Sequence, residues 1–570
     1  MEERNLQISQ LPLYILNMRR RVFPDFEFNS FRDNYRLLIF YFTFAHIKNK
    51  LMKYFNLFLV LFVFASCGTP KFKQPENVTE VLKLAGDNKA ELEKVIQHYK
   101  ETGEVIKEEA AYFLIGNMKD HSYVKYQLVD TAGNAVGFKV LTYPDYNQMV
   151  AGWDSVESKI GNIHYKTDTI IKDYNVITAD YLIKNIDLAI EAWDNNPWSK
   201  RLSFDQFCEY VLPYRGSSEP LDEWRPYFIK EFKWLKDSLN DPTNPVEAAT
   251  LINNSIKSWF RFDPIYYRHP TDQGIAEMLE SKAGRCEDMT NLAIFAMRAN
   301  GVPVMSDFTP YWANSGNNHA WNATLNKKDS VIIFMGGEAN PGEYKLGGKL
   351  AKVYRKTFAI QKSSLAERKD EWEKAPPYLG SSDIKDVTAD YVPVKNIKIK
   401  LTEELPDSTK YAYVCVFNSG EWKAIDFGRV YNKKVSFYNV GMDIAYLPAF
   451  YIDGSIIPAG NAFILTDSGK TDYKKPDLKN TVTLNLISTT RKVTKDATDT
   501  SEKTFFKKNK YYTLYYWDNK WVESGKRKTG DGPLVFKDVP SNAIYWLVED
   551  NSRKEERIFT IGENGNQIWW

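Results

Sequence analysis

The sequence predicts a multidomain α+β protein with helices first, a mixed segment in the middle and strands last. Three observations indicate this order. Apolar residues recur at three- and four-residue steps from about 77 to 235, as in helices that bury one face. A glycine turn, a cysteine and one helix stand in the middle of the chain. From about 385 onward, short alternating runs indicate strands, and their pattern occurs twice.

The composition excludes some classes of protein. The 570 residues are enough for several domains. Lys and Arg number 75 against 73 Asp and Glu, so the charge does not indicate a nucleic-acid-binding protein. The six histidines do not cluster and no Cys-x-x-Cys pair occurs, so we expect no metal and no organic cofactor. Aromatic residues make up 15%, which indicates β-rich cores or, as the rarer alternative, surfaces that stack on glycans and peptides.

An export signal is predicted near the N-terminus. Met52 and a lysine begin a run of about ten apolar residues, which ends in small residues before Cys67. The segment 52–67 resembles a bacterial lipoprotein signal with Phe64-Ala-Ser-Cys67 as its lipobox. The resemblance implies that Cys67 carries lipid, with an ordinary signal peptide or a buried helix as the alternatives.

A lipid-linked Cys67 would change how the N-terminal segment of the chain is interpreted. Translation would start at Met52, residues 1–51 would be a non-native extension or disordered, and residues 68–76 would form a tether. The protein would then be anchored in the cell envelope. Surface-exported lipoproteins of Bacteroidetes often carry acidic residues directly after the cysteine, and this chain has none there. We therefore expect the periplasmic face rather than the cell surface.

The middle of the chain predicts a reactive cysteine. Cys286 precedes a helical pattern that Gly301 and Pro303 terminate. The apolar positions of that pattern are Leu292, Phe295, Ala296 and Ala299. At a helix N-terminus, free N–H groups and the helix dipole favour a thiolate over a thiol. His319 follows about 33 residues later, at the start of a predicted extended segment, and nucleophile before base is one order that a Cys–His site takes.

Three motifs here resemble the transglutaminase-like superfamily, which has a papain-type fold. They are Gly284-Arg-Cys286, Arg298-Ala-Asn-Gly-Val-Pro303 and His319-Ala-Trp321. The resemblance covers about 70–80 residues and implies a papain-like core with a Cys–His pair. The third catalytic member of the family is usually an Asp one strand after the histidine. Here the best-placed carboxylate is Glu338, and Asn340 is the alternative.

The resemblance implies acyl transfer through a thioester. The Cys286 thiolate would attack a carboxamide or peptide carbonyl, while its own backbone N–H and a side-chain donor stabilise the oxyanion. His319 would protonate the departing amine and Glu338 would orient the imidazole. Because bacterial members are often hydrolytic, we expect hydrolysis of peptide or amide bonds rather than cross-linking. The substrate would be a peptide, a protein or an amide derived from peptidoglycan.

Other polar residues near the site are given structural roles. Glu287 and Asp288 would raise the pKa of the thiol if they pointed at it, but first-turn carboxylates favour the helix itself, so we assign them no catalytic role. Asp307 is interpreted as structural. Three charged residues of the helical region could shape a cleft, although ion pairs between helices are the commoner arrangement. They are Arg215, Glu219 and Arg225.

The last third of the chain predicts two similar β domains. The run Tyr411–Leu447 parallels Tyr511–Leu547 at an offset of about 99–100 residues, which indicates tandem β-sandwiches. Cys208 and Cys415 are predicted to be buried free thiols, with a disulfide between them as the alternative. The expected segments are a helical domain (77–240), a transglutaminase-like core (241–365), a linker (366–390) and two β-sandwiches (391–470 and 480–570).

A second function class fits the same sequence. A papain-like shell without catalysis, flanked by aromatic-rich β domains, could bind glycans or peptides at the cell envelope. The aromatic content does not separate this class from an enzyme with attached β domains, so glycan contacts through the β domains are expected in either case.

Overall fold

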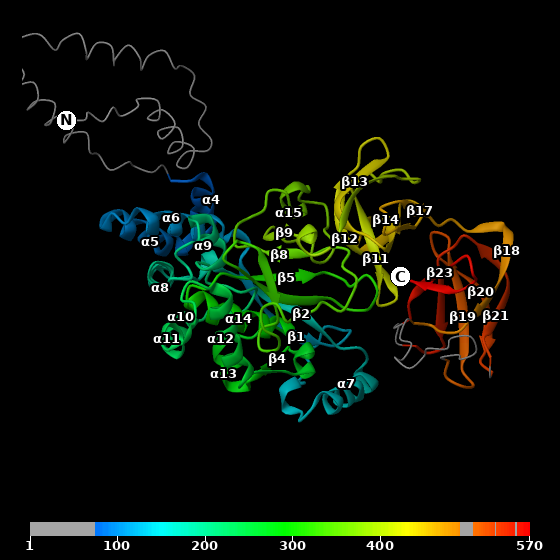
Figure 1. Ribbon diagram of the computed structural model, residues 1–570, viewed down its shortest axis with the longest axis horizontal. Coiled ribbons are helices and arrows are strands. Elements are labelled where there is room, and N and C mark those ends of the chain that lie inside the picture. The colour runs from blue at the N-terminus through cyan, green and yellow to red at the C-terminus, as the bar shows by residue number, and fades with distance from the viewer. Residues whose placement is uncertain (1–73, 491–505, 531, 553–555) are drawn as a thin grey trace, which may run out of the picture. The chain divides into compact units, whose positions relative to one another are not determined.

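The computed structural model describes residues 74–490, 506–530, 532–552 and 556–570 (Figure 1). The predicted signal segment, with Cys67 and the residues before it, lies outside these ranges. Within them, no helix has both the length and the apolar content that a bilayer crossing requires. The described chain mixes helices and sheets, so the predicted α+β class is confirmed.

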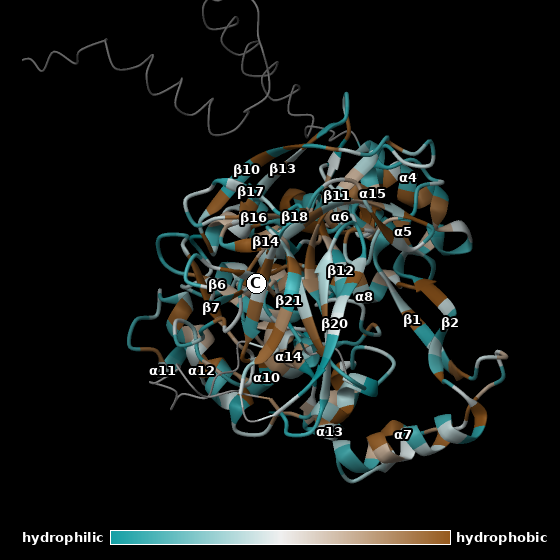
Figure 2. Ribbon diagram, turned by 90° about the vertical axis from the view of Figure 1, so that its right-hand side faces the viewer, coloured by the Kyte–Doolittle hydropathy of each residue, from teal (hydrophilic) through white to brown (hydrophobic). Residues whose placement is uncertain are grey.

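The N-terminal part is mainly helical, as the apolar spacing predicts. Its helices are α4 (Glu76–Leu84), α5 (Lys89–Thr102), α6 (Val105–Gly116), α8 (Ala179–Asn195), α9 (Phe204–Tyr210), α10 (Trp224–Glu231) and α11 (Leu235–Ser238). The sequence did not predict the antiparallel hairpin of β1 (Ser122–Val129) and β2 (His164–Lys172), nor α7 (Tyr146–Ile160) between its strands. Figure 2 shows α7 banded in brown and teal, as hydrophobic and hydrophilic residues alternate along it, and the helix buries Met149 and Trp153.

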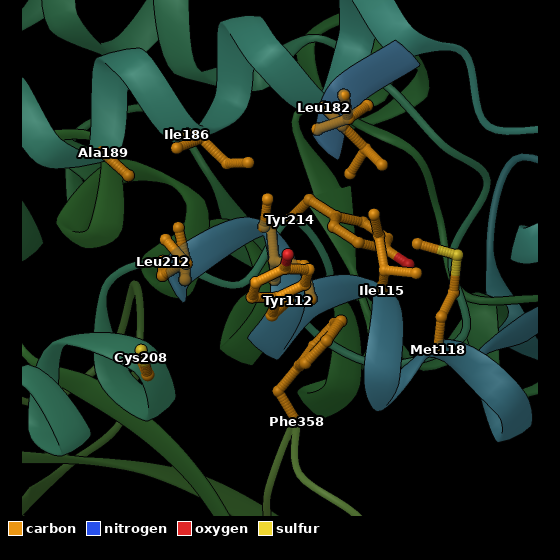
Figure 3. Packing of buried hydrophobic residues seen from close by; sticks show 14 of the residues in the cluster. Tyr112, Ile115, Met118, Leu182, Ile186, Ala189, Cys208, Leu212, Tyr214 and Phe358 are labelled. Carbon is orange, nitrogen blue, oxygen red and sulfur yellow. The ribbon is translucent and has the colours of Figure 1, made fainter. Parts of the chain in front are cut away.

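The helices of this part share their core with the sheet that follows. Figure 3 shows Tyr112 and Ile115 of α6 facing Leu182 and Ile186 of α8, with Phe358 entering from a distant segment. The same cluster includes residues of two strands of the central sheet, namely Met305, Ala323 and Leu325. The helical part therefore supports the sheet that carries the site, and one continuous apolar core joins them.

A five-stranded antiparallel sheet forms the centre, in the order β7-β6-β5-β8-β9. Its strands are β5 (Val304–Thr309), β6 (His319–Leu325), β7 (Val331–Phe334), β8 (Tyr354–Lys356) and β9 (Ile384–Asp386). Strand β8 is only three residues long, and β9 falls within the segment expected to be a linker. The short helix α15 (Leu365–Arg368) begins at the last residue of the expected core and extends into the expected linker.

Helices α12 (Pro245–Lys257), α13 (Ile275–Ser281) and α14 (Cys286–Ala299) precede this sheet, with the short parallel pair β3 (Arg261–Phe262) and β4 (Ala283–Gly284). Helix α14 is buried along almost its whole length. It ends where predicted, because Gly301 adopts a φ of 69° and a Cβ there would lie 2.6 Å from the carbonyl oxygen of Ala192. Strand β5 then begins after Pro303.

The C-terminal part contains the expected repeat. The first copy holds β10 (Val394–Lys400), β11 (Tyr411–Asn418), β12 (Glu421–Arg429), β13 (Lys434–Gly441), β14 (Ile444–Ile452), β15 (Ser455–Pro458), β16 (Phe463–Leu465) and β17 (Thr471–Tyr473). The second holds β18 (Asp477–Leu486), β19 (Tyr511–Trp517), β20 (Trp521–Lys528), β21 (Leu534–Ser541), β22 (Tyr545–Glu549), β23 (Ile558–Ile561) and β24 (Gln567–Trp569).

Equivalent strands pair in the same order in both copies. The larger sheets follow β12-β11-β14-β16-β17 and β20-β19-β22-β23-β24, and the smaller ones pair β10 with β13 and β18 with β21. In the first copy, Ile397 and Ile399 of the small sheet share a core with Val414 of the large one. Only residues 474–476 connect β17 to β18, so the link between the copies is shorter than the stretch 471–479 left between the two expected sandwiches.

The described cysteines are all free thiols. Cys208 lies in the core of the helical part, and Cys415 lies in an apolar cluster that the first β copy shares with the central sheet and the second copy. The alternative of a disulfide between them is therefore wrong, and the prediction of buried free thiols is confirmed.

Candidate active site

Cys286 is the first residue of α14, and a carboxylate fixes the start of that helix. Asp288 accepts hydrogen bonds from the backbone N–H of Arg285 and of Gln273, each at 2.9 Å. The first bond caps the start of α14, and the second ties that start to the loop before α13. The structural role predicted for Asp288 is therefore confirmed, and Cys286 is held at a defined helix end with 8% of its surface exposed.

The thiol of Cys286 does not rest as the expected thiolate. Its Sγ donates to the carboxylate of Glu287, with 2.9 Å between Sγ and Oε2. Burial raises the pKa of the Cys286 thiol well above its usual range, and the negative charge of Glu287 raises it further. The helix N-terminus favours a thiolate, but here burial and the adjacent carboxylate are the larger effects. The expectation that Glu287 only favours the helix is wrong.

Glu287 also lies near an N–H group that has no hydrogen-bond partner. The same Oε2 atom is 3.8 Å from Nε of Arg285, and that Nε is buried without a hydrogen-bond partner. The other end of the Arg285 guanidinium is fixed, because Nη2 bonds Asp272 at 2.7 Å. A small rotation of Glu287 would therefore exchange the thiol for a charged partner.

His319 begins β6 and lies next to the cysteine in the fold. The backbone amide of Ala320 acts on the Cys286 sulfur and lowers the pKa of the thiol, so β6 reaches α14 at its N-terminus. Nε2 of His319 forms a hydrogen bond with the hydroxyl of Tyr344. Burial lowers the pKa of His319, which favours a neutral imidazole that can accept a proton. The structure thus places His319 directly before the residue whose amide acts on the thiol.

Tyr344, rather than Glu338, is the side chain bonded to the histidine ring. Glu338 is exposed, in a turn that follows β7. The turn that carries Glu338 packs against α14 through Gly336. A Cβ at Gly336 would lie 2.4 Å from the carbonyl oxygen of Met289 in α14. Asn340 is also occupied elsewhere, since its side chain bonds those of Asn253 and Asn254 on α12.

No pattern in the sequence could have indicated Tyr344. It lies 25 residues after His319 in a loop without hydrophobic periodicity. Its pKa is raised to about 12, chiefly by burial, so it remains a neutral phenol at ordinary pH. A neutral hydroxyl orients the imidazole but stabilises an imidazolium less than a carboxylate does.

The loop before His319 is fixed by the first β copy. The Nδ2 atom of Asn418, at the end of β11, donates to three backbone carbonyl oxygens of that loop, those of Trp312 (3.0 Å), Ser315 (2.9 Å) and Asn317 (2.9 Å). Arg557 of the second copy donates to the carbonyl of Ala313 at 2.7 Å. The ring of Trp312 stacks on His319 with 5.9 Å between centroids. Both β copies therefore contact the loop that carries the histidine.

A buried ion pair joins β5 to β8, beside the strand β6 that carries His319. Asp307 of β5 forms two hydrogen bonds with Arg355 of β8, at 2.8 and 2.7 Å. Asp307 also accepts from the hydroxyl of Tyr391, and Tyr391 accepts from the indole N–H of Trp321 at 3.0 Å. Asp307 is completely buried and pairs with Trp321 in the sheet register. Its structural role is confirmed.

The charged residues of the helical part are also structural. Arg215 pairs with buried Asp173, and Arg225 donates to backbone carbonyls such as that of Arg298 (3.0 Å). The Glu219 carboxylate accepts from the backbone N–H of Gly216 (2.8 Å) and of Ser217 (2.7 Å). The prediction of ion pairs holds for Arg215, whereas Arg225 and Glu219 hold backbone segments.

A cavity of about 320 Å³ opens beside the cysteine. Glu287 and Ala320, which both act on the thiol, form part of its wall. The rest of the wall carries hydroxyl groups and both charges, including Ser217, Lys356 and Asp383, alongside a larger apolar surface. A substrate segment with polar or charged groups would find hydrogen-bond partners there.

The family model for the transglutaminase-like superfamily matches residues 233–330, which contain α12, α14, β5 and β6. This segment is a transglutaminase-like domain. Cys286 and His319 both lie in the transglutaminase-like domain, whereas Glu338 and Tyr344 follow the matched residues. The match indicates a cysteine-based enzyme.

Two solved structures are similar to the chain. One is described as a "putative cysteine protease" from Cytophaga hutchinsonii, at 19% identity over 25% of this chain, with a TM-score of 0.20. That match spans 45% of the other protein, less than half of its length. The other is red sea bream transglutaminase, at 10% identity over 78% of this chain and 76% of that one, with a TM-score of 0.19. No curated protein matches the chain.

Proposed function

We propose that the protein is an exported cysteine enzyme that transfers acyl groups through a Cys286 thioester. We further propose that it hydrolyses peptide or amide bonds in preference to cross-linking them. The observation that carries the proposal is the meeting of α14 and β6, where the Ala320 amide acts on the Cys286 sulfur and Glu287 and Ala320 line a cavity, with His319 directly before Ala320 in β6.

The reaction would begin from a neutral pair. With the Nε2–H of His319 donating to Tyr344, Nδ1 is the free acceptor of the ring. Once the Glu287 carboxylate leaves the thiol, Nδ1 takes the S–H proton while the sulfur forms a bond to the substrate carbonyl carbon. The C–N bond then breaks, and His319 returns the proton to the departing amine.

The second half of the reaction would use the same residues. His319, neutral again, accepts a proton from water as the oxygen attacks the thioester carbonyl; the C–S bond then breaks, and His319 returns the proton to the sulfur to restore the thiol. The backbone N–H of Cys286 at the start of α14 is placed to donate to the oxyanion in both halves. The hydroxyl and charged groups in the cavity wall support water as the acceptor, because they offer it hydrogen-bond partners.

A trapping experiment tests the proposal. The purified protein is incubated with a p-nitrophenyl ester of a small acyl group, and the acylated residue is identified by mass spectrometry. We expect acylation at Cys286, and about 10²- to 10⁴-fold slower acylation in His319→Ala because the base is lost. Cys208→Ala is the matched control, since that thiol lies in another core. Equal acylation rates with and without His319 would contradict the proposal that His319 is the catalytic base of a cysteine enzyme.

Partition of the trapped acyl group distinguishes hydrolysis from cross-linking. We expect the thioester to decay to the free acid, with little transfer to added putrescine. Transfer of most acyl groups to the amine would favour cross-linking instead. Peptides, proteins and peptidoglycan-derived amides are the substrate classes to compare.

The contact with Glu287 favours a second candidate, a non-catalytic lipoprotein that binds glycans or peptides. A thiol whose pKa is held high by a carboxylate at 2.9 Å is poorly nucleophilic. If this candidate is right, no acyl-enzyme forms with any donor, while ligand binding persists in Cys286→Ala.

The envelope location forms part of the proposal. We propose a lipid anchor at Cys67, with the protein at the periplasmic face of the membrane. Metabolic labelling with a palmitate analogue should mark the protein, and Cys67→Ser should remove both the label and membrane association. Labelling that survives this substitution would argue against the anchor.

A further inference from the structure

A second cavity, of about 1050 Å³, lies away from Cys286. Its wall combines β8, β9 and α15 of the central part with β10, β12 and β13 of the first β copy. It is therefore built where two parts of the chain meet, which is a frequent position for binding sites. Nothing in the acyl-transfer mechanism uses it.

The floor of this cavity is a buried charge network. Lys352, 1% exposed, bonds Asp386 at 2.7 Å and lies 3.2 Å from Asp426. Its Nζ also donates to the carbonyl of Tyr438 at 2.7 Å. The two carboxylates are the only ones among the described residues that line the cavity, and Lys352 offsets part of their charge.

The exposed part of the cavity wall is cationic. Four exposed basic side chains line it, from α15, β10, β12 and β13: Arg368, Lys398, Arg429 and Lys434. With Lys352 included, five cations and two carboxylates thus line the cavity. Like charges in a concave wall raise the local potential and attract anions. Arginine can also bind a carboxylate through two parallel hydrogen bonds.

Two tyrosines on the same wall are exposed to an unusual degree. Tyr431 has 65% and Tyr438 has 62% of its surface exposed, and both line the cavity. The Arg429 guanidinium lies over the ring of Tyr431, 5.6 Å from its centroid, which holds a cation beside an apolar ring face. Such a ring offers a flat apolar face with a polar tip. Hydroxyl and amide groups of Ser363, Asn432 and Ser436 complete the wall.

We propose that this cavity binds an anionic glycan, such as a chain of uronic acid sugars. Its carboxylates would meet the four exposed cations, the faces of its rings would stack on the two tyrosines, and its hydroxyls would bond the serines and Asn432. An acidic peptide would use the cations but would leave the tyrosine faces without flat partners. The inference is independent of the chemistry at Cys286 and goes beyond it.

Titration calorimetry with three oligosaccharide families tests the site. The probes are hexamers of galacturonate, mannuronate and glucuronate-containing hyaluronan fragments, added to the purified protein. At least one should bind, and Tyr431→Ala/Tyr438→Ala should weaken it at least tenfold. Arg429→Ala/Lys434→Ala should weaken it similarly and reduce its salt dependence. Failure of all three families to bind at millimolar concentration would overturn the proposal.

Matched controls keep the result interpretable. Tyr473→Ala and Lys470→Ala alter exposed residues of the same β copy outside the cavity and should leave binding unchanged. Hexaglutamate and maltohexaose separate charge from sugar, and both should bind at least tenfold more weakly than the uronate. Hexaglutamate that binds as tightly, and is unaffected by the tyrosine substitutions, would show an acidic-peptide site instead. Cys286→Ala should bind the glycan normally, so failure of the enzyme proposal would leave this one standing.

Discussion

At the residue scale, Glu287 determines the state in which Cys286 rests. Its negative charge stabilises the protonated thiol, so it raises the thiol pKa. Glu287→Gln removes the charge and should shift the pH profile of iodoacetamide modification to lower pH, with faster reaction at pH 7. Peptide mapping of the alkylated Cys286 measures the rate. Glu280→Gln, an exposed carboxylate on α13, is the control and should not move the profile. An unchanged profile in Glu287→Gln would mean that burial alone sets the pKa.

Tyr344 is the residue-scale candidate for orienting the imidazole. Tyr344→Phe keeps the ring but removes the hydroxyl that bonds Nε2 of His319. We expect kcat for acylation to fall roughly 10- to 100-fold with little change in KM, because a misoriented base affects the transition state more than binding. Glu338→Gln should behave like the unmodified protein. If Glu338→Gln is the slower variant, the originally expected carboxylate acts on His319 during turnover.

The pair Cys286–His319 could be predicted because its signals are local. A glycine turn before a helix, a Gly-x-Pro exit and a histidine at a strand start are all short-range patterns. The third partner depends on how the chain returns after β7. Gly336 packs against α14 and the turn directs Glu338 outward, so neither spacing nor residue type could indicate Tyr344.

At the element scale, the first β copy fixes the loop before β6. Asn418 alone supplies three hydrogen bonds to that loop. Asn418→Ala should loosen Trp312 and His319 and slow acylation of Cys286 by about tenfold. Asn418→Asp should be at least as slow, because a carboxylate cannot donate to carbonyl oxygens.

The control and the readout separate positioning from general stability. Asn564→Ala changes an exposed turn of the second copy and should leave the acylation rate unchanged. The thermal midpoint of Asn418→Ala should change little compared with its rate. If Asn418→Ala had a lower thermal midpoint but a normal acylation rate, the hydrogen bonds of Asn418 would not be needed to position the loop.

Elements with strong periodicity were predicted well, and those set by tertiary contacts were not. α14 begins and ends where its apolar pattern and Gly301 predict. The hairpin β1–β2 was missed because its strands are largely exposed and lack clear alternation. β9 was missed because three residues beside β8 carry no periodic signal.

At the scale of the whole molecule, the two β copies share an apolar core. Phe417 of the first copy, 1% exposed, contacts the rings of Trp521 (5.6 Å) and Trp546 (5.3 Å) in the second. Phe417→Ala should lower the free energy of unfolding by about 3–5 kcal/mol, measured by urea denaturation. Tyr438→Ala, at an exposed position, should change it by less than about 0.5 kcal/mol. Similar losses in both variants would mean that the copies do not depend on this contact.

The repeat could be predicted from the sequence, but its relation to the site could not. Matching residues at an offset of about 100 indicate two similar domains. They do not indicate that Asn418 and Arg557 reach the same loop, because such contacts join residues more than 100 positions apart.

The contact between Cys286 and Glu287 has a consequence for oxidation. Peroxide reacts with thiolates and much less with thiols, so a cysteine held in its protonated form resists conversion to sulfenic acid. Glu287 therefore protects the sulfur as well as restraining it. Only while the carboxylate is displaced would the sulfur be open to oxidants, and at that moment the substrate itself would cover it.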